Sequence, residues 1–221
     1  MVKGKDKDDV NMRISPSHQD TDFRYPLSIE DKIVLLEDRI LGWKLNIAEQ
    51  VINGQRDSDG AIIKEPIQHA EFATLDILFS YFEMIGKYEA GYADEYESKS
   101  HFKEGAYAVF PVLKMPLPPP VIGVQGVVRP IADEVLDLLY KGVRCGLYHA
   151  GVTNSKIVLT GGVEHPLSFD IQNKMLIINP HLLVDAIKTH FAGYITRLQD
   201  STNEELRINF EKRFNYDNGI G

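Results

Sequence analysis

Four stretches of this chain repeat apolar residues at steps of three and four, and this spacing limits the fold more than any other feature. The stretches span residues 29–51, 67–88, 131–143 and 183–198. Because an α-helix turns once every 3.6 residues, each spacing places its apolar side chains along one face of a helix. We therefore expect a mainly α protein in which four long amphipathic helices bury these faces against one another.

The first and second helices are the longest of the four. In the first, the expected inner face comprises Ile29, Ile33, Leu36, Ile40, Trp43, Ile47 and Val51. The second is expected over residues 66–90, because Pro66 suits the first turn of a helix and Gly91 suits the position after its end. The expected inner face of this helix comprises Ile67, Ala70, Thr74, Leu78, Tyr81, Ile85 and Tyr88.

The later helices carry start signals. Asn179 followed by Pro180 predicts the start of the fourth helix, as a cap and a first helical residue. Thr202 with Glu205 three residues later predicts a capping box that opens a fifth, shorter helix. The sequence thus indicates a four-to-five-helix up-and-down bundle.

The remaining segments organise the chain around a single helical domain over residues 28–215. Residues 1–27 are dense in charged and polar side chains, which predicts a disordered or extended tail. Too many prolines fall between residues 91 and 130 for a regular element, so we expect an irregular insertion there that holds at most a short helix. Residues 156–178 alternate as short strands do, which predicts a small β-hairpin appendage.

Composition and charge limit the classes of function that this chain can have. The chain has 32 acidic and 24 basic side chains, a net charge of −8, whereas nucleic-acid binders usually present a basic surface. Broad nucleic-acid binding is therefore not expected, although a local basic pocket is compatible with this charge. A single cysteine excludes an intrachain disulfide, and no apolar run reaches the ~20 residues that span a bilayer. We expect a cytoplasmic protein without a membrane span.

The segment "RCGLYHAG" at the end of the third helix is the one motif that suggests a specific chemistry. It places Arg144 and His149 five residues apart. On an ideal helix this separation is about 140° of arc and ~7.5 Å of rise, so the two side chains point apart. Bending at Gly142 and Gly146, which flank the arginine, would bring such residues together. A two-fold axis beside the helix would do the same by combining residues from two chains. The motif therefore predicts a homodimer.

This segment resembles the HEPN superfamily, whose mark is an arginine, four to six intervening residues and a histidine. The resemblance covers an apolar helix, Arg144, an inward Leu147, His149 and a glycine exit closely, and the bundle over residues 28–199 more loosely. It implies a dimeric helical bundle that cleaves RNA without a metal or cofactor, in a toxin–antitoxin, defence or RNA-processing role. Cys145 departs from the polar residue that many members carry after the arginine, which leaves the role of that position open.

The two side chains suggest the chemistry. Histidine exchanges protons near neutral pH, so His149 is expected to move the proton of the RNA 2′-hydroxyl or of the leaving 5′-oxygen. Arg144 matches phosphate oxygens with two donors and is expected to stabilise the transition state. The resemblance implies a 2′,3′-cyclic phosphate product. Further substrate contacts are expected from Tyr148, Lys141 and Cys145, and Glu71 on the second helix is a candidate carboxylate for orienting the histidine.

Other interpretations stay open. A non-catalytic helical module that dimerises or binds a nucleotide or a protein partner, such as an antitoxin, is favoured by the acidic balance and by Cys145. In a purely structural interpretation, Arg144 pairs with a carboxylate on a neighbouring helix and His149 caps the helix end. A metal hydrolase is not expected, because none of the seven histidines pairs with another histidine or the cysteine at ligand spacing.

Overall fold

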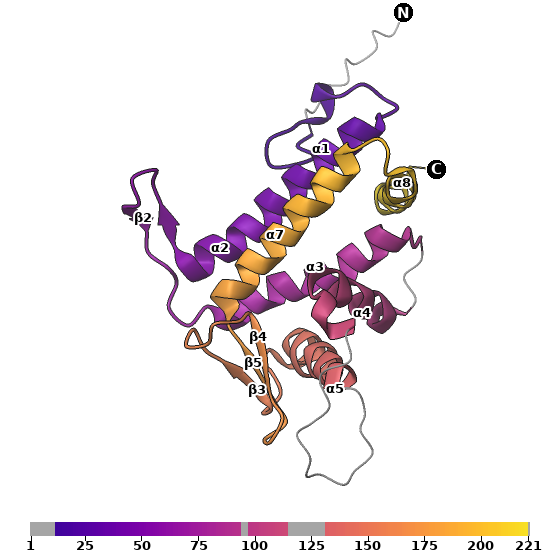
Figure 1. Ribbon diagram of the computed structural model, residues 1–221. Helices are drawn as coiled ribbons and strands as arrows, with labels where there is room; N and C mark the ends of the chain where they lie inside the picture. Colours follow the sequence, from indigo (N-terminus) through magenta and orange to yellow (C-terminus); the bar gives the residue numbers. More distant parts are fainter. Residues whose placement is uncertain (1–11, 94–96, 115–130, 221) are drawn as a thin grey trace, which may run out of the picture.

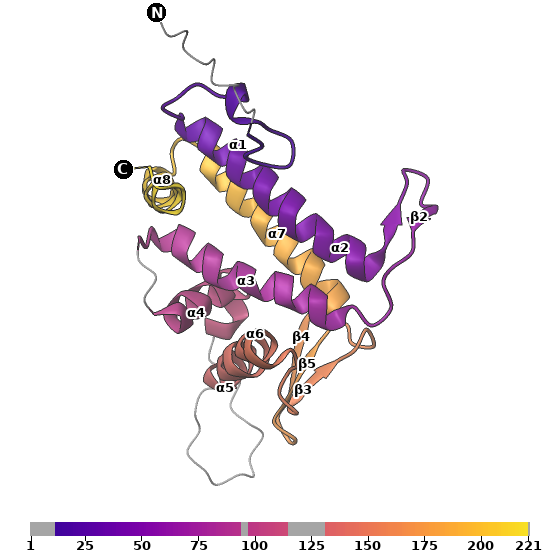
Figure 2. The same cartoon turned by 180° about the vertical axis from the view of Figure 1, so that it is seen from behind.

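Two long helical rods lie side by side and antiparallel in the computed structural model (Figures 1 and 2). The first rod consists of α1 (Ile29–Ile40), the π-helical segment η2 (Leu41–Leu45) and α2 (Asn46–Asn53). The second rod is α7 (Pro180–Gln199). The structure describes residues 12–93, 97–114 and 131–220.

The remaining helices complete a mainly α fold. They are α3 (Glu71–Ala90), α4 (Ser98–Val109), α5 (Ile131–Asp137), π-helical η4 (Leu138–Cys145), α6 (Gly146–Ala150) and α8 (Glu204–Asn218), with 3-10 turns η1 (Asp20–Asp22) and η3 (Pro111–Lys114). Figure 1 shows α3 diverging from the two rods. α8, seen end-on, lies between α3 and the rods at the end where they are farthest apart. In the described part of the chain, no helix is both long and apolar enough to cross a bilayer.

A small three-stranded sheet lies at the edge of the helices. Its strands are β3 (Ile157–Leu159), β4 (Leu167–Asp170) and β5 (Met175–Ile178). β4 and β5 form the expected antiparallel hairpin, but β3 pairs with β5 in parallel, which the sequence analysis did not predict. Leu176 and Ile178 are fully buried, so the sheet joins the core and is more than an appendage. A second, two-stranded sheet, β1 (Gln55–Arg56) and β2 (Ile62–Lys64), links α2 to α3.

The predicted helices are confirmed, with one boundary moved. The Asn179 side chain caps α7 by accepting hydrogen bonds from the backbone N–H groups of His181 and Leu182. The apolar residues expected on the inner face of this helix are all buried: Leu183, Ile187, Phe191, Tyr194 and Leu198. The second helix begins at Glu71 and not at residue 66. His69 has a φ of 59°, and a residue in this left-handed region interrupts a right-handed helix. Ile67 accordingly lies outside the helix and is 60% exposed.

The expected inner face of the first helix is wrong after Ile40. Trp43 and Ile47 are 48% and 42% exposed. The residues that are buried instead, after Ile40, are Leu45, Ala48 and Ile52. The cause is η2, because a π segment holds an extra residue in one turn and rotates everything after it. A periodicity of 3.6 residues does not predict this rotation.

Two further expectations need correction. Residues 12–27 lie against α1 and do not form a free tail, because Ser15 is fully buried and Ser15 Oγ donates a 2.6 Å hydrogen bond to Asp38. The Thr202–Glu205 capping box does not form, since α8 begins at Glu204 and the Thr202 hydroxyl donates to Asp200. Of the irregular insertion expected near residues 91–130, α4 and η3 are regular, and residues 94–96 and 115–130 lie outside the described residues.

Asp38 anchors the N-terminal segment, which leads to a first prediction. Its carboxylate accepts hydrogen bonds from the hydroxyls of Ser15 and Ser17 and from the Ser17 N–H, at 2.6–2.9 Å. Burial raises the pKa of Asp38, but these hydrogen bonds outweigh it and hold the pKa below its ordinary value. Asp38→Ala should therefore speed amide hydrogen exchange in residues 12–27, with the helices unchanged.

The same pKa shift sets the pH dependence. A lowered carboxyl pKa stabilises the fold above the ordinary aspartate value of about 3.9 and loses this effect as the pH falls through the lower folded value. In the native protein, protection of residues 12–27 should accordingly decline only in acid. Equal exchange in the native protein and in Asp38→Ala at pH 7 would contradict this role.

Candidate functional site

Arg144 lies near the end of η4, where η4 packs against α3. Its Nη2 donates a 3.1 Å hydrogen bond to Glu83 Oε2 on α3. The guanidinium also lies over the rings of Tyr148 and Tyr140, 5.2 and 6.0 Å from their centroids. The side chain is 27% exposed, so the guanidinium is oriented by neighbours on two helices while part of it faces solvent.

Glu83 is the centre of a polar network under Arg144. Its carboxylate also accepts a hydrogen bond of 2.8 Å from the Ser98 hydroxyl and pairs with Lys87 at 3.2 Å. Burial raises the pKa of Glu83, but the Ser98 hydrogen bond and the charges of Lys87 and Arg144 outweigh it and lower the pKa below its ordinary value. Glu83 therefore stays ionised and holds the arginine in place.

Arg144 and Tyr148 line an open groove of about 390 Å³ that follows one face of α3. The other lining residues are Asp76, Phe79, Ser80, Glu83, Met84 and Lys87 of α3 and Arg213 and Asp217 of α8. The charged side chains here are three cations and three carboxylates, and the Arg213 guanidinium pairs with Asp217 as Arg144 does with Glu83. The three cations, Lys87, Arg144 and Arg213, are thus balanced by the carboxylates of Asp76, Glu83 and Asp217.

His149 is exposed at the end of α6 and does not line this groove. Its ring meets that of Tyr148 edge-on, with centroids 5.0 Å apart. Among the described residues it makes no hydrogen bond, so it does not cap the helix; Gly151, at a φ of 69°, ends α6 instead. Within one chain, Arg144 thus lines the groove and His149 does not. Figure 2 shows α6 beside α3.

The other residues singled out from the sequence lie around the motif with different partners. Lys141 is exposed and pairs with Asp137 at 3.4 Å, and Cys145 is a half-buried free thiol. Glu71 starts α3 and forms no hydrogen bond or ion pair within the described ranges. Glu83, on the same helix, is the carboxylate that contacts the motif.

Sequence reasoning missed Glu83, although a signal was present. Asp76, Ser80, Glu83 and Lys87 recur at steps of four, three and four, which marks a second, polar stripe on the helix. This stripe lines the groove.

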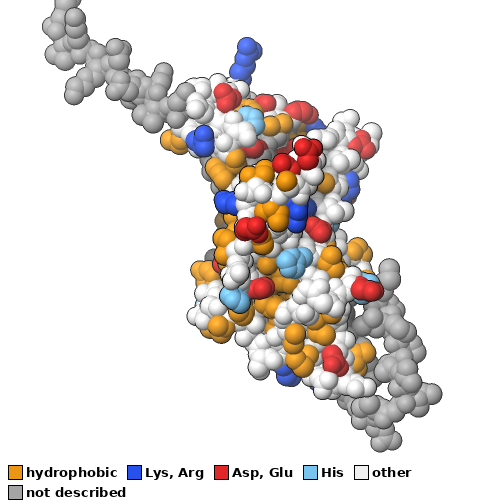
Figure 3. All heavy atoms as spheres, turned by 90° about the vertical axis from the view of Figure 1, so that its left-hand side faces the viewer, with side chains coloured by type: hydrophobic (Ala, Val, Ile, Leu, Met, Phe, Trp, Pro, Cys, Tyr) orange, Lys and Arg blue, Asp and Glu red, His pale blue; other side chains and the backbone are white. Residues whose placement is uncertain are grey.

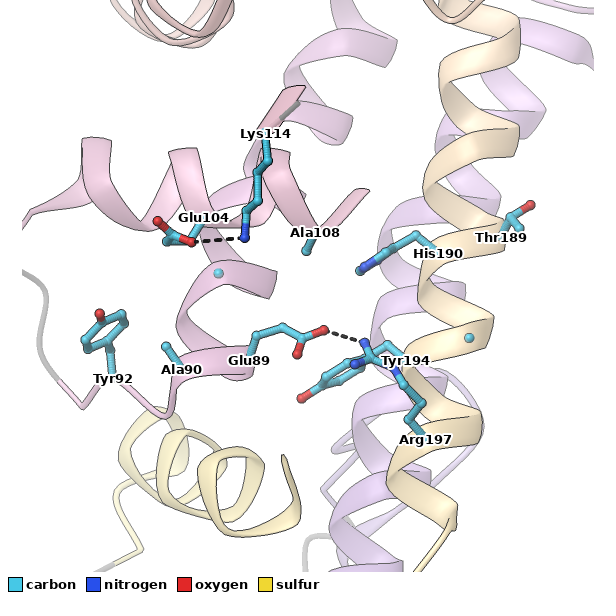
Figure 4. A pocket seen from close by; sticks show the side chains of 12 residues that line it. Glu89, Ala90, Tyr92, Glu104, Ala108, Lys114, Thr189, His190, Tyr194 and Arg197 are labelled. Atoms are coloured by element: carbon cyan, nitrogen blue, oxygen red, sulfur yellow. Dashed lines mark hydrogen bonds and ion pairs between the residues drawn. The ribbon is translucent and has the colours of Figure 1, made fainter. Parts of the chain in front are cut away.

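A second and larger groove, of about 810 Å³, lies between α3, α4 and α7 (Figure 4). Its charged groups are paired with one another, Glu89 with Arg197 and Glu104 with Lys114. His190 is hydrogen-bonded to the Tyr81 hydroxyl at 2.8 Å, and burial lowers the pKa of the imidazole. None of the candidate site residues predicted from the sequence lines this groove, so it is distinct from the motif site.

Comparisons with known proteins do not assign this chain to a family. No family model, curated protein or solved structure matches this chain. Within residues 12–93, 97–114 and 131–220, no group of three or more His, Cys, Asp or Glu side chains is placed to hold a metal ion.

Proposed function

We propose that this protein is a metal-independent endoribonuclease of the HEPN type, with Arg144 and His149 as its catalytic residues. One observation carries the proposal. Arg144 lines a groove and is held there by Glu83, while the imidazole of His149, five residues further on, is exposed and forms no hydrogen bond among the described residues. A fixed guanidinium can stabilise negative charge on a phosphate, and an accessible imidazole can move a proton, which are the two roles that the proposed cleavage assigns.

The proposed reaction uses the nucleophile of RNA itself. His149 accepts the proton of the 2′-hydroxyl, the 2′-oxygen bonds to phosphorus, and the bond from phosphorus to the 5′-oxygen breaks. The departing 5′-oxygen takes up a proton from water, and His149 returns its proton to the solvent, which leaves a 2′,3′-cyclic phosphate and a 5′-hydroxyl. Arg144 stabilises the additional negative charge on the phosphate oxygens with the N–H groups that Glu83 does not occupy.

The net acidity of the chain restricts the mode of RNA binding. Figure 3 shows Lys and Arg scattered singly on a face of the described residues, without a continuous basic surface. We place RNA binding in the groove beside Arg144, where Glu83 holds the guanidinium. Cleavage in a toxin–antitoxin, defence or RNA-processing role requires no broad basic surface.

A homodimer is part of the proposal, because in one chain Arg144 lines the groove and His149 does not. Tyr148 and Val152, on either side of His149, are 72% and 55% exposed. Exposed apolar side chains at this point fit a surface that a second copy covers. Light scattering at micromolar concentration should give twice the chain mass of 25.0 kDa.

Val152→Glu should shift the dimer toward monomer, because a charge would then face the partner. Ile208→Glu is the matched control, since Ile208 is a 65% exposed aliphatic side chain on α8. A monomeric native protein would contradict the shared site.

A non-catalytic binding module is the second candidate, and the ion pair between Arg144 and Glu83 favours it. The ionised Glu83 competes with a phosphate for the guanidinium. RNA cleavage in the presence of a chelator decides between the two candidates. A dimer that binds partners but leaves all RNAs intact would favour the binding module.

A further inference from the structure

Lys44 is placed by η2 on the side of the first rod that faces α3. Its Nζ donates a 3.0 Å hydrogen bond to the Ser80 hydroxyl, and that hydroxyl in turn donates to the Ile77 carbonyl at 2.7 Å. The extra residue in the π turn directs Lys44 toward α3 and the neighbouring Trp43 toward solvent. The side chain of Lys44 is half-buried.

Lys44 differs from the other shielded lysines in lacking a carboxylate. Lys32, Lys87 and Lys188 pair with Glu211, Glu83 and Glu49, respectively. Across the described ranges, no carboxylate lies at ion-pair distance from Lys44, and Ser80 is its hydrogen-bonding partner. Burial accordingly lowers the pKa of the Lys44 ammonium. A partly desolvated cation without an opposite charge is unfavourable, so an anion beside it would be stabilised.

The position of Ser80 connects Lys44 to the motif site. Ser80 lines the groove that also holds Arg144, and it lies one helical turn before Glu83, the partner of Arg144. Lys44 and Arg144 thus approach the same polar stripe of α3, one from the first rod and one from η4. An anion with several linked charges could contact both.

We propose that Lys44 binds a backbone phosphate of the RNA strand whose scissile phosphate lies at Arg144. The inference rests on the proposed nuclease function and extends it, because it places the strand along α3 and adds a residue to substrate binding. An ammonium binds phosphate as a point charge and reads no base, so Lys44 would contribute affinity without sequence preference. Lys44 is a positioning residue here and takes no part in proton transfer.

Lys44→Met tests the inference, because methionine keeps most of the apolar stem and removes the charge. Binding of a fluorescent single-stranded RNA should weaken about tenfold, and the slope of log K against log salt should fall by about 0.7, the value for one phosphate contact. KM for cleavage should rise while kcat stays nearly constant. Lys188→Met is the matched control, since Lys188 is also half-buried but pairs with Glu49 away from the groove; its RNA affinity should not change.

Thermal melting separates binding from a structural role. Since no carboxylate is left unpaired, Lys44→Met should melt at or above the native temperature. An unchanged RNA affinity and salt slope, or a large melting loss with unchanged affinity, would overturn the inference. RNA binding without cleavage would sink the nuclease proposal alone. If the native protein binds no RNA, thermal melting with tripolyphosphate tests the anion site instead. A rise in the melting temperature of the native protein but not of Lys44→Met supports an anion site at Lys44. An equal rise in both proteins overturns it.

Discussion

Replacing His149 with alanine should lower RNA cleavage by a factor of about 10²–10⁴, the usual contribution of a general acid or base. His149 is exposed and forms no hydrogen bond in the described part of the chain, so the substitution removes the proton-transfer group with little effect on the fold. The measurement is the rate of cleavage of a labelled RNA in EDTA, together with a thermal melt. RNA affinity should stay close to native, since the phosphate contacts remain.

Two companion variants make this result specific. His165→Ala removes another exposed histidine, in the loop before β4, and should cleave at the native rate. Arg144→Lys keeps a positive charge near Glu83 but loses the planar two-point fit to phosphate, so its cleavage should also fall strongly. Cleavage that survives both His149→Ala and Arg144→Lys would place the active site elsewhere. If the native protein cleaves no RNA and both variants melt at much lower temperatures, the two residues are structural.

Local sequence signals predicted the helices well, because each signal acts over a few residues. The apolar spacing of α7 and the Asn179 cap are examples in which one helix turn contains the whole cause. The π segment η2 is different. It is held partly by distant residues, since Pro16 packs against Gly42, where an added Cβ would lie 2.4 Å from the proline ring. After this contact Trp43 is exposed and Lys44 reaches Ser80 on α3, and the spacing of apolar residues predicts neither.

The candidate site was predictable in part for the same reason. The motif residues could be singled out because they lie on one helix, only five residues apart. Glu83 and Lys44 come from two other helices, and their relevance depends on how closely those helices approach η4 and α3. The parallel pairing of β3 with β5 likewise depends on contact between strands that are not consecutive in the sequence. Residues that a single element positions could be inferred, whereas those that packing brings together required the structure.

The approach of α4 to α3, which supplies Ser98 to the Glu83 network, depends on two glycines. A Cβ on Gly105 of α4 would lie 1.7 Å from the Phe82 carbonyl oxygen, and one on Gly86 of α3 would lie 2.0 Å from that of His101. The helices therefore touch backbone to backbone, and the Phe82 and Phe102 rings pack 5.3 Å apart beside this contact. A methyl group here cannot be accommodated by rotating a side chain.

Gly105→Ala should accordingly destabilise the fold by at least about 2 kcal/mol, as overpacking does, and lower Tm by about 4–8 °C. The gain in helix propensity of about 1 kcal/mol is smaller than this clash. Gly193→Ala on α7 is the matched control, because nothing lies within 4 Å of its added Cβ, and its Tm should be equal or higher. Because Ser98 would move with α4, Gly105→Ala should also weaken the hold of Glu83 on Arg144 and reduce RNA cleavage below the melting range. A native Tm in Gly105→Ala would show that the two helices are not in backbone contact.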